Sequence, residues 1–270
     1  KRLRDRNPRL IYASISGFGN EGPDRDRPAF DTVAQAASGF LRLLVNPENP
    51  RVVGPAIADA MTGFYAAQGI LAALHERNNS GKGCTVETSM FEAMCHFNLD
   101  DFTHLLSADE VMGPYSRPHV SQSYVFACAD GKWLALHMSS PPKFWENLAT
   151  AVEFPDMLSL PAFENREARI AHYEDVVAFL APIFAAKDRD HWCAELTRLE
   201  VPNSAVRSSV EVLESDQAKA LGIAVSDPRG PQGAFHTIRS PLTFNGQRMT
   251  EVTAPPTLGQ HNGDIKGVLD

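Results

Sequence analysis

The spacing of apolar and polar positions divides the first hundred residues into alternating strands and helices. A β-branched, apolar run over 10–16 stops at Gly17 and predicts a buried strand. Apolar residues at helical spacing predict three helices, with one short strand before the last of them. These elements cover 31–44, 59 to the polar stop at 78–83, 84–87 and 88–106. Their order predicts an open α/β layer.

The pattern changes after residue 112. A loop at 113–119 precedes two apolar runs, 121–128 and 132–138, and the Asp-Gly turn between them predicts a hairpin. The chain after Asp227 is rich in Pro and Gly and contains only short strand candidates. Further helices are predicted at 144–152, 166–184, 189–199 and 210–221.

These elements predict an α/β protein with three parts. Residues 1–112 form a large domain with an open, Rossmann-like sheet. Residues 113–225 form a smaller inserted α/β domain, and 226–270 return to the large domain.

Composition narrows the class of protein. The chain has 270 residues, a net charge of -8 and 43% hydrophobic residues, which suffices for a core and excludes disorder. The acidic charge, with no dense basic stretch after the first residues, argues against nucleic-acid binding. No continuous apolar run approaches roughly 18 to 20 residues and no signal peptide opens the chain, so no membrane association is expected.

The cysteines and histidines predict no metal site. Four widely spaced cysteines without a CxxC pair predict buried free thiols in a cytoplasmic protein. The nine histidines contain no HxxxH pair, so no zinc site is expected. The cysteines are Cys84, Cys95, Cys128 and Cys193.

Two local features are candidates for chemistry. The loop 17–19, with Gly22, follows a strand but lacks GxGxxG spacing, so it is either an ordinary turn or a loop that lets backbone approach a ligand. Asp59 is flanked by small and apolar residues at an expected helix start, where free amides and the helix dipole keep a partly buried carboxylate ionised. This pattern fits a plain N-cap or a nucleophile.

Four segments together resemble the family III CoA-transferases, which include formyl-CoA transferase and the carnitine and bile-acid CoA-transferases (the CaiB/BaiF family). The similarity is most specific between residues 7 and 93 and loose between 113 and 225. The segments are 7–19 continuing through Gly22-Pro23 to 27–31, then 59–63 running into 69–74, Arg77 and 81–83, then 86–93, and finally 258–262.

The resemblance implies that Asp59 is the catalytic nucleophile. Its carboxylate would attack a donor acyl-CoA, and the released CoA thiolate would return to give an aspartyl-CoA thioester that a carboxylic acid acceptor then attacks. The resemblance also assigns CoA contacts to Ile15, Ser16, Gly17 and Phe18. Ser16 stands where some members carry Lys, and Phe18 where they carry Tyr, so no charged contact is assigned to this loop.

Two other functions stay open. The same fold carries α-methylacyl-CoA racemases, which pair an Asp with a His, but Phe30 stands in the position of that His and cannot move a proton. A catalytically idle CoA-binding paralogue is the other alternative. We expect CoA and acyl-CoA as substrates, a small carboxylic acid as acceptor, and no tightly bound cofactor or metal.

The resemblance carries further expectations about the site and the assembly. Residues 115–122 replace the glycine-rich loop that covers the active site of formyl-CoA transferase, and Arg117 or His119 is either solvated or pairs with the acceptor carboxylate. Family members are interlocked homodimers with an additional N-terminal segment, so the chain is expected to be a fragment or to lack part of the CoA site. Arg25 and Arg27 are the nearby loop cations.

Overall fold

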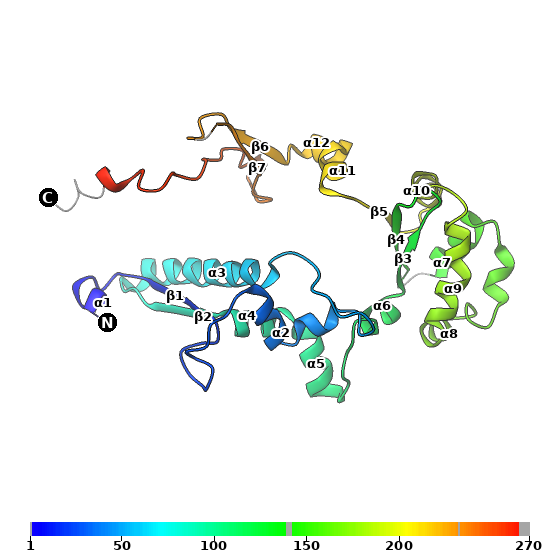
Figure 1. The fold of residues 1–270 in the computed structure, drawn as a ribbon, viewed down its shortest axis with the longest axis horizontal. Coiled ribbons are helices and arrows are strands. Elements are labelled where there is room, and N and C mark those ends of the chain that lie inside the picture. Colours follow the sequence, from blue (N-terminus) through cyan, green and yellow to red (C-terminus); the bar gives the residue numbers. More distant parts are fainter. Residues whose placement is uncertain (1, 139–141, 232, 265–270) are drawn as a thin grey trace. The chain divides into compact units, whose positions relative to one another are not determined.

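The computed structural model describes residues 2–138, 142–231 and 233–264 (Figure 1). They fold into two compact units, each made of two segments of the chain. The first unit contains 1–124 and 137–178, and the second contains 125–136 and 179–270. The predicted domain boundaries, and the predicted return of the last segment to the large domain, stay predictions.

The first unit is built on a strand-helix-strand arrangement. β1 (Tyr12–Ser16) and β2 (Thr85–Ser89) form a two-stranded parallel sheet, with Ser14 opposite Glu87. Parallel neighbours require a long crossover, and α3 (Ile57–Ser80) supplies it and packs along both strands (Figure 1). The positions of both strands and of this helix confirm the predictions from the sequence. The prediction that the first strand is buried was wrong, because Tyr12 and Ile15 are 49% and 56% exposed and no residue of β1 is buried.

One glycine lets α3 lie close to the sheet, and another ends the helix. A Cβ added at Gly69 would lie 2.6 Å from Cγ1 of Val86 on β2, so only glycine fits at this approach without a shift. Gly81 follows the helix with φ of 73°, and its N–H donates to the carbonyl of Arg77. This left-handed residue ends α3 at the predicted stop.

Two predicted single helices are each broken into two elements. Gly39, with φ of 82°, separates α2 from a short 3-10 helix, so the prediction of one helix over 31–44 was wrong. Asn98, with φ of -90° and ψ of 29°, interrupts the predicted helix 88–106 in the same way. The elements are α2 (Asp31–Ala37), η1 (Phe40–Leu43), α4 (Met90–Phe97) and α5 (Leu99–Ala108).

The helix α3 is also long and apolar enough to cross a membrane, by length and composition alone. It has 24 residues with a mean hydropathy of 1.2 in its most apolar window, of which 22% is buried. No continuous apolar run marks this helix in the sequence, because Gln68 and His75 interrupt it. One side of α3 packs on the sheet and on α2 and α4, as the core helix of an α/β layer does.

A second sheet has the strand order β3-β4-β5. The turn between its first two strands contains Gly131 with φ of 72°, and the N–H of Cys128 donates to the carbonyl of Lys132 over 2.8 Å. This geometry confirms the predicted hairpin. The strands are β3 (Ser123–Ala127), β4 (Trp133–His137) and β5 (Asn203–Val206), and β5 runs antiparallel to β4.

Aromatic side chains form the cores around these helices and strands. In the first unit the rings of Trp145 and Phe163 meet edge to face, 5.9 Å apart, and the Arg169 guanidinium lies 4.6 Å from the Trp145 ring. In the second unit Phe184 contacts Trp192 at 5.0 Å between ring centroids. All four of these tryptophan and phenylalanine side chains are at most 2% exposed. Trp145, Phe184 and Trp192 therefore anchor the helices that carry them, α7 (Pro142–Ala151), α9 (Tyr173–Phe184) and α10 (Arg189–Arg198), and Phe163 anchors the turn before α8 (Arg166–Ala171).

The remaining elements are short. The predicted helices 166–184 and 210–221 are interrupted at His172 and Ser215. The helices are α1 (Arg2–Arg6), α6 (Ser116–Ser121), α7 (Pro142–Ala151), η2 (Pro155–Ser159), α8 (Arg166–Ala171), α9 (Tyr173–Phe184), α10 (Arg189–Arg198), α11 (Ser209–Glu214) and α12 (Asp216–Leu221). Two antiparallel ribbons follow, β6 (Ala224–Asp227) with β7 (Phe235–Ile238) and β8 (Thr243–Phe244) with β9 (Gln247–Arg248).

Candidate active site

Asp59 lies in the first turn of α3, but it is not the N-cap. The helix begins at Ile57 and its N-cap is Ala56, whose side chain cannot accept a hydrogen bond, so the prediction of an Asp59 cap was wrong. Asp59 is the third helical residue, and its side chain is exposed rather than partly buried. Among the residues that the structure describes, its carboxylate has no hydrogen-bond or ion-pair partner.

The capping role belongs to Asp31, which no local sequence pattern predicts as a cap of α3. Its Oδ1 accepts the N–H of Ala58 over 2.8 Å and that of Asp59 over 3.4 Å. Its Oδ2 accepts the side-chain amide of Gln35 over 2.6 Å. Asp31 therefore satisfies free amides of the first turn of α3 from another helix, 27 residues away in sequence.

A small apolar cluster supports this first turn from below. Ala34, Ala58 and Met94 are fully buried and join α2, α3 and α4. Partly buried Met61 and Met90 pack against them. Because Ala58 precedes Asp59 and points into this cluster, the backbone of the candidate nucleophile rests on the junction of three helices.

The loop after β1 is held in a defined conformation. The Ser16 hydroxyl accepts the N–H of Gly19 over 3.0 Å, and the Gly17 carbonyl accepts the N–H of Phe91 over 3.0 Å. The Phe18 ring lies 6.1 Å from the Phe91 ring. These contacts fix the residues that the resemblance assigns to CoA, and Ile15, the fourth of them, is 56% exposed.

The segment 29–31 connects this loop to the first turn of α3. A Cβ added at Gly17 would lie 2.6 Å from the Cβ of Ala29, so the loop and this segment touch where Gly17 lacks a side chain. Two residues later, Asp31 binds the amides of α3. Three consecutive residues thus link the loop to the first turn of α3, and the middle one, Phe30, is 79% exposed.

Acidic groups surround one side of this loop. A hollow of about 290 Å³ at the ends of β1 and β2 is lined by Ser16, Phe18, Glu21, Glu87 and Glu92, among others. The Glu87 carboxylate accepts the side-chain amide of Asn20 over 2.6 Å. The concentration of carboxylates makes this hollow electrostatically unfavourable for a phosphate group.

The two loop cations, Arg25 and Arg27, form ion pairs with neighbouring carboxylates. Arg25 pairs with Asp26 at 3.1 Å and Arg27 with Asp24 at 3.3 Å, and all four side chains are more than half exposed. The Arg27 guanidinium also lies 5.0 Å from the centroid of the Phe18 ring. Arg27 is therefore the loop cation that the structure places against a predicted CoA-contacting residue.

Arg117 and His119 lie on the helix α6 rather than in a loop, which corrects the prediction for 113–119. Arg117 is 70% exposed and lies 3.9 Å from the Asp100 carboxylate of α5. His119 stacks on the Tyr173 ring at 4.2 Å and lies 3.6 Å from Glu174. Both side chains already contact protein groups, and their assignment to the acceptor stays a prediction.

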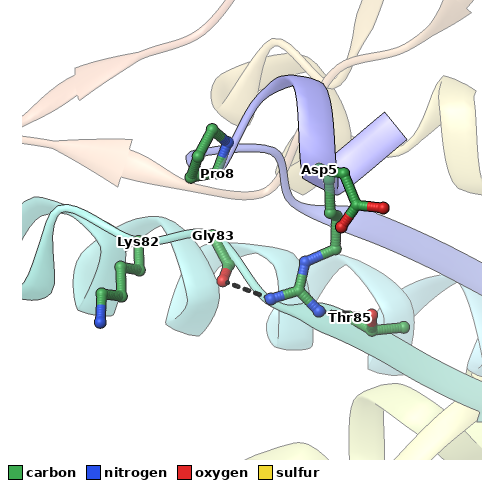
Figure 2. A pocket seen from close by; sticks show the side chains of 6 residues that line it. Asp5, Pro8, Lys82, Gly83 and Thr85 are labelled. Carbon is green, nitrogen blue, oxygen red and sulfur yellow. Dashed lines mark hydrogen bonds between the residues drawn. The ribbon is translucent and has the colours of Figure 1, made fainter. Parts of the chain in front are cut away.

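A separate hollow of about 550 Å³ lies at the opposite end of α3 (Figure 2). There the Arg4 guanidinium donates to the Gly83 carbonyl over 3.1 Å and to the Thr85 hydroxyl over 3.3 Å. Since 24 helical residues extend about 36 Å, this hollow is roughly a helix length from Asp59. Arg4 therefore binds a carbonyl group in the segment that follows the helix end.

The cysteines are free thiols, and burial affects three of them. All four are free, but only Cys128 is buried, so the prediction of buried thiols was wrong for the three half-buried ones. Burial raises the pKa of Cys95, Cys128 and Cys193, which disfavours the nucleophilic thiolate. Within the described parts of the chain, no group of three or more metal-ligating side chains comes together.

Comparison with known proteins places this geometry in context. Residues 1–262 match the model of a family described as CoA-transferase family III. The chain is 25% identical over 97% of its length to (R)-2-hydroxy-4-methylpentanoate CoA-transferase of Clostridioides difficile and 30% identical over 98% to formyl-CoA:oxalate CoA-transferase of Streptomyces avermitilis. It spans about two thirds of these relatives, 66% and 68% of their respective lengths.

Solved structures agree with the fold. A CaiB/BaiF family protein from Brucella suis matches with a TM-score of 0.84 and 26% identity, over 99% of this chain and 70% of the other. Rv3272 from Mycobacterium tuberculosis matches with a TM-score of 0.80 and 25% identity, over 97% of this chain and 70% of the other. The mixed α/β fold predicted from the sequence is confirmed.

Proposed function

The chain belongs to CoA-transferase family III, and we propose that it transfers CoA from an acyl-CoA donor to a carboxylic acid, with Asp59 as nucleophile. The observation that carries this proposal is the exposed, unpartnered Asp59 carboxylate on a supported helix turn, beside the loop 15–18. Relatives named for acyl-CoA and carboxylate substrates support the reaction class.

CoA transfer by this route requires a carboxylate that acts as a nucleophile and is later released as a leaving group. A carboxylate oxygen of Asp59 attacks the thioester carbonyl, the carbon-sulfur bond breaks, and the CoA thiolate departs from a mixed anhydride. The thiolate then attacks the aspartyl carbonyl and releases the donor acid. In the second half of the reaction, the acceptor carboxylate attacks the aspartyl-CoA thioester and displaces the CoA thiolate, which leaves a mixed anhydride between Asp59 and the acceptor. The thiolate then attacks the acceptor's acyl carbon, forms the new acyl-CoA and releases the Asp59 carboxylate. No net proton or electron is consumed.

The first turn of α3 suits this role. The positive end of the helix dipole favours negative charge, so it stabilises the attacking carboxylate without an ion-pair partner that would lower its reactivity. Holding the anhydride and the thiolate together replaces a bimolecular encounter, which is worth roughly 7–11 kcal/mol in well-oriented cases.

We place the neutral part of CoA, rather than its phosphates, against the acidic hollow. Ile15, Ser16, Gly17 and Phe18 offer backbone groups and apolar surface, whereas Glu87 on the adjacent strand would repel phosphate. Binding energy from the remote nucleotide then positions the thioester at Asp59.

The other expectations accompany this proposal. An interlocked homodimer, a Rossmann-like open sheet, a cytoplasmic location and a role for Arg117 or His119 in holding the acceptor are consistent with the family. Racemisation is disfavoured because Phe30, on the segment beside Asp59, offers no titratable group.

Intact-protein mass spectrometry tests the proposal. The protein is incubated with a panel of acyl-CoAs, with and without hydroxylamine, beside Asp59→Ala. Asp216→Ala is the matched control, since it removes another exposed aspartate from the first turn of a helix. A CoA-sized adduct that hydroxylamine removes, present in the control and absent from Asp59→Ala, supports the covalent route and identifies the donor.

The remaining outcomes separate the alternatives. Binding of CoA by calorimetry with no adduct and no exchange between acyl-CoA and acids would indicate the idle paralogue. Exchange of an α-proton in D₂O without CoA transfer would indicate the racemase.

A further inference from the structure

The amides of the first turn of α3 are bound by a carboxylate from a different helix. Asp31 begins α2, and its Oδ1 lies 2.8 Å from the Ala58 nitrogen and 3.4 Å from the Asp59 nitrogen. The natural N-cap position, Ala56, contributes no side-chain bond. Among the described residues, Asp31 is thus the side chain that satisfies these two amides.

Asp31 is itself held in place. Its Oδ2 accepts the amide of Gln35, which is 1% exposed, and the next turn of the helix is closed by the Ser38 hydroxyl donating to the Gln35 carbonyl over 3.1 Å. Ala34, between them, is fully buried against Ala58 in the cluster described above. The carboxylate therefore has little freedom to leave the amides of α3.

The position of this bond matters because the N–H of Asp59 is one of its donors. The backbone of Asp59 is bound by Asp31, while its side chain is left without a partner and exposed. A fixed backbone with a free side chain is the arrangement that a nucleophile on a helix end requires, since a shift of about 1 Å can cost about 100-fold in rate.

We propose that Asp31 is a positioning residue that orients the Asp59 nucleophile by capping α3 in trans. The inference rests on the proposed function of Asp59. Asp31 touches no substrate in this proposal and acts only through the backbone of the residues 58–59.

Two variants of Asp31 test the idea. Asp31→Ala removes both hydrogen-bond acceptors, so kcat should fall about 10- to 100-fold while the KM of the donor acyl-CoA changes little. Asp31→Asn keeps one oxygen for the Ala58 amide, and the buried Oε1 of Gln35, which has no partner among the described residues, can accept from the new amide group. The Asn variant should therefore retain activity within about 3-fold of the original protein.

Hydrogen exchange of a peptide covering 55–64 provides a readout that does not depend on activity. Loss of a cap should raise the exchange rate of the Ala58 and Asp59 amides about 2- to 30-fold in Asp31→Ala, with little change elsewhere. Ser208→Ala is the matched control, since it removes the capping box of α11 and leaves α3 unaltered. It should keep kcat and the protection of 55–64.

The outcomes distinguish this inference from the proposed function. If Asp59→Ala abolishes transfer and Asp31→Ala keeps both kcat and the exchange protection, the role of Asp31 is refuted. A global rise in exchange in folded Asp31→Ala, unrescued by Asn, would also refute it, because it indicates a purely structural side chain. If Asp59→Ala remains active, the nucleophile assignment fails, and the exchange data alone decide whether Asp31 caps α3.

Discussion

Replacing two glycines of the same helix by alanine should have opposite effects. Gly63 and Gly69 both lie in the interior of α3. A Cβ at Gly63 would meet no heavy atom within 4 Å, whereas a Cβ at Gly69 would lie 2.6 Å from Cγ1 of Val86. The gain in helix propensity is the same at both positions. The difference between the two variants therefore measures the energetic cost of the steric contact between helix and sheet.

The magnitudes follow from that geometry. Alanine gains about 0.5–1 kcal/mol over glycine in a helix interior, so Gly63→Ala should stabilise the protein by that amount. Carbon atoms prefer a separation of about 3.5–4.0 Å, so Gly69→Ala forces a shift of roughly 1 Å between α3 and β2. Overpacking of this kind costs about 1–3 kcal/mol, which offsets or exceeds the gain in propensity and leaves Gly69→Ala net destabilising by up to about 2.5 kcal/mol.

Urea unfolding of the variants in a double-mutant cycle measures these changes in the free energy of unfolding. In a Val86→Ala background the obstructing methyl group is gone, so Gly69→Ala should become neutral or stabilising, with a coupling energy of about 1–3 kcal/mol. The Gly63→Ala effect should not depend on Val86. The reasoning is refuted if Gly69→Ala stabilises the protein as much as Gly63→Ala does without the Val86 change.

Three further predictions concern packing and charge. Met94→Ala should lower the free energy of unfolding by about 2–5 kcal/mol in a chemical denaturation, since Met94 is fully buried beneath the first turn of α3. The hydrogen bond from Arg189 lowers the pKa of the Glu211 carboxyl to about 2, so the ionised Glu211 should contribute to stability above about pH 4.5 and lose that contribution as the pH falls toward 2. In Glu211→Gln the melting temperature should therefore depend less on pH between about 4.5 and 2. An unchanged pH dependence of the melting temperature would contradict the assignment. Gly83→Ala should reduce the soluble folded yield, measured by circular dichroism, because its Cβ would lie 2.0 Å from the Leu10 carbonyl oxygen.

Local patterns predicted the parts of the fold that local forces decide. The β-branched run that becomes β1, the Asp-Gly hairpin and the left-handed Gly81 at the end of α3 each depend on residues close in sequence. The breaks at Gly39 and Asn98 were missed because apolar spacing continues across them, while the backbone angles of single residues interrupt the helices.

Local sequence patterns predicted less of the candidate site, above all which residue caps α3. Asp59 was identified as a candidate from its surroundings and from a family resemblance, but an aspartate near a helix start was mistaken for its cap. The true acceptor, Asp31, is 27 residues away and was visible in the sequence only as part of the segment 27–31 that carries the resemblance. A carboxylate that binds amides of another helix leaves no periodic signature, because its partner is chosen by tertiary packing.

Two aspartates, Asp31 and Asp59, occur at the start of α3, although one would suffice to cap the helix. Their separate roles, a cap and a proposed nucleophile, account for the pair. If Asp59 had itself capped α3, its carboxylate would accept a hydrogen bond from the backbone and would be turned back toward the helix, away from a substrate. Asp31 accepts these backbone hydrogen bonds instead. In the proposed function, the carboxylate that stabilises the helix start and the carboxylate that attacks a thioester therefore belong to different residues. The cost is a dependence on the packing of α2 against α3, which the buried Ala34, Ala58 and Met94 maintain. A substitution in that cluster should therefore lower kcat in the protein that is still folded, in addition to its cost in stability.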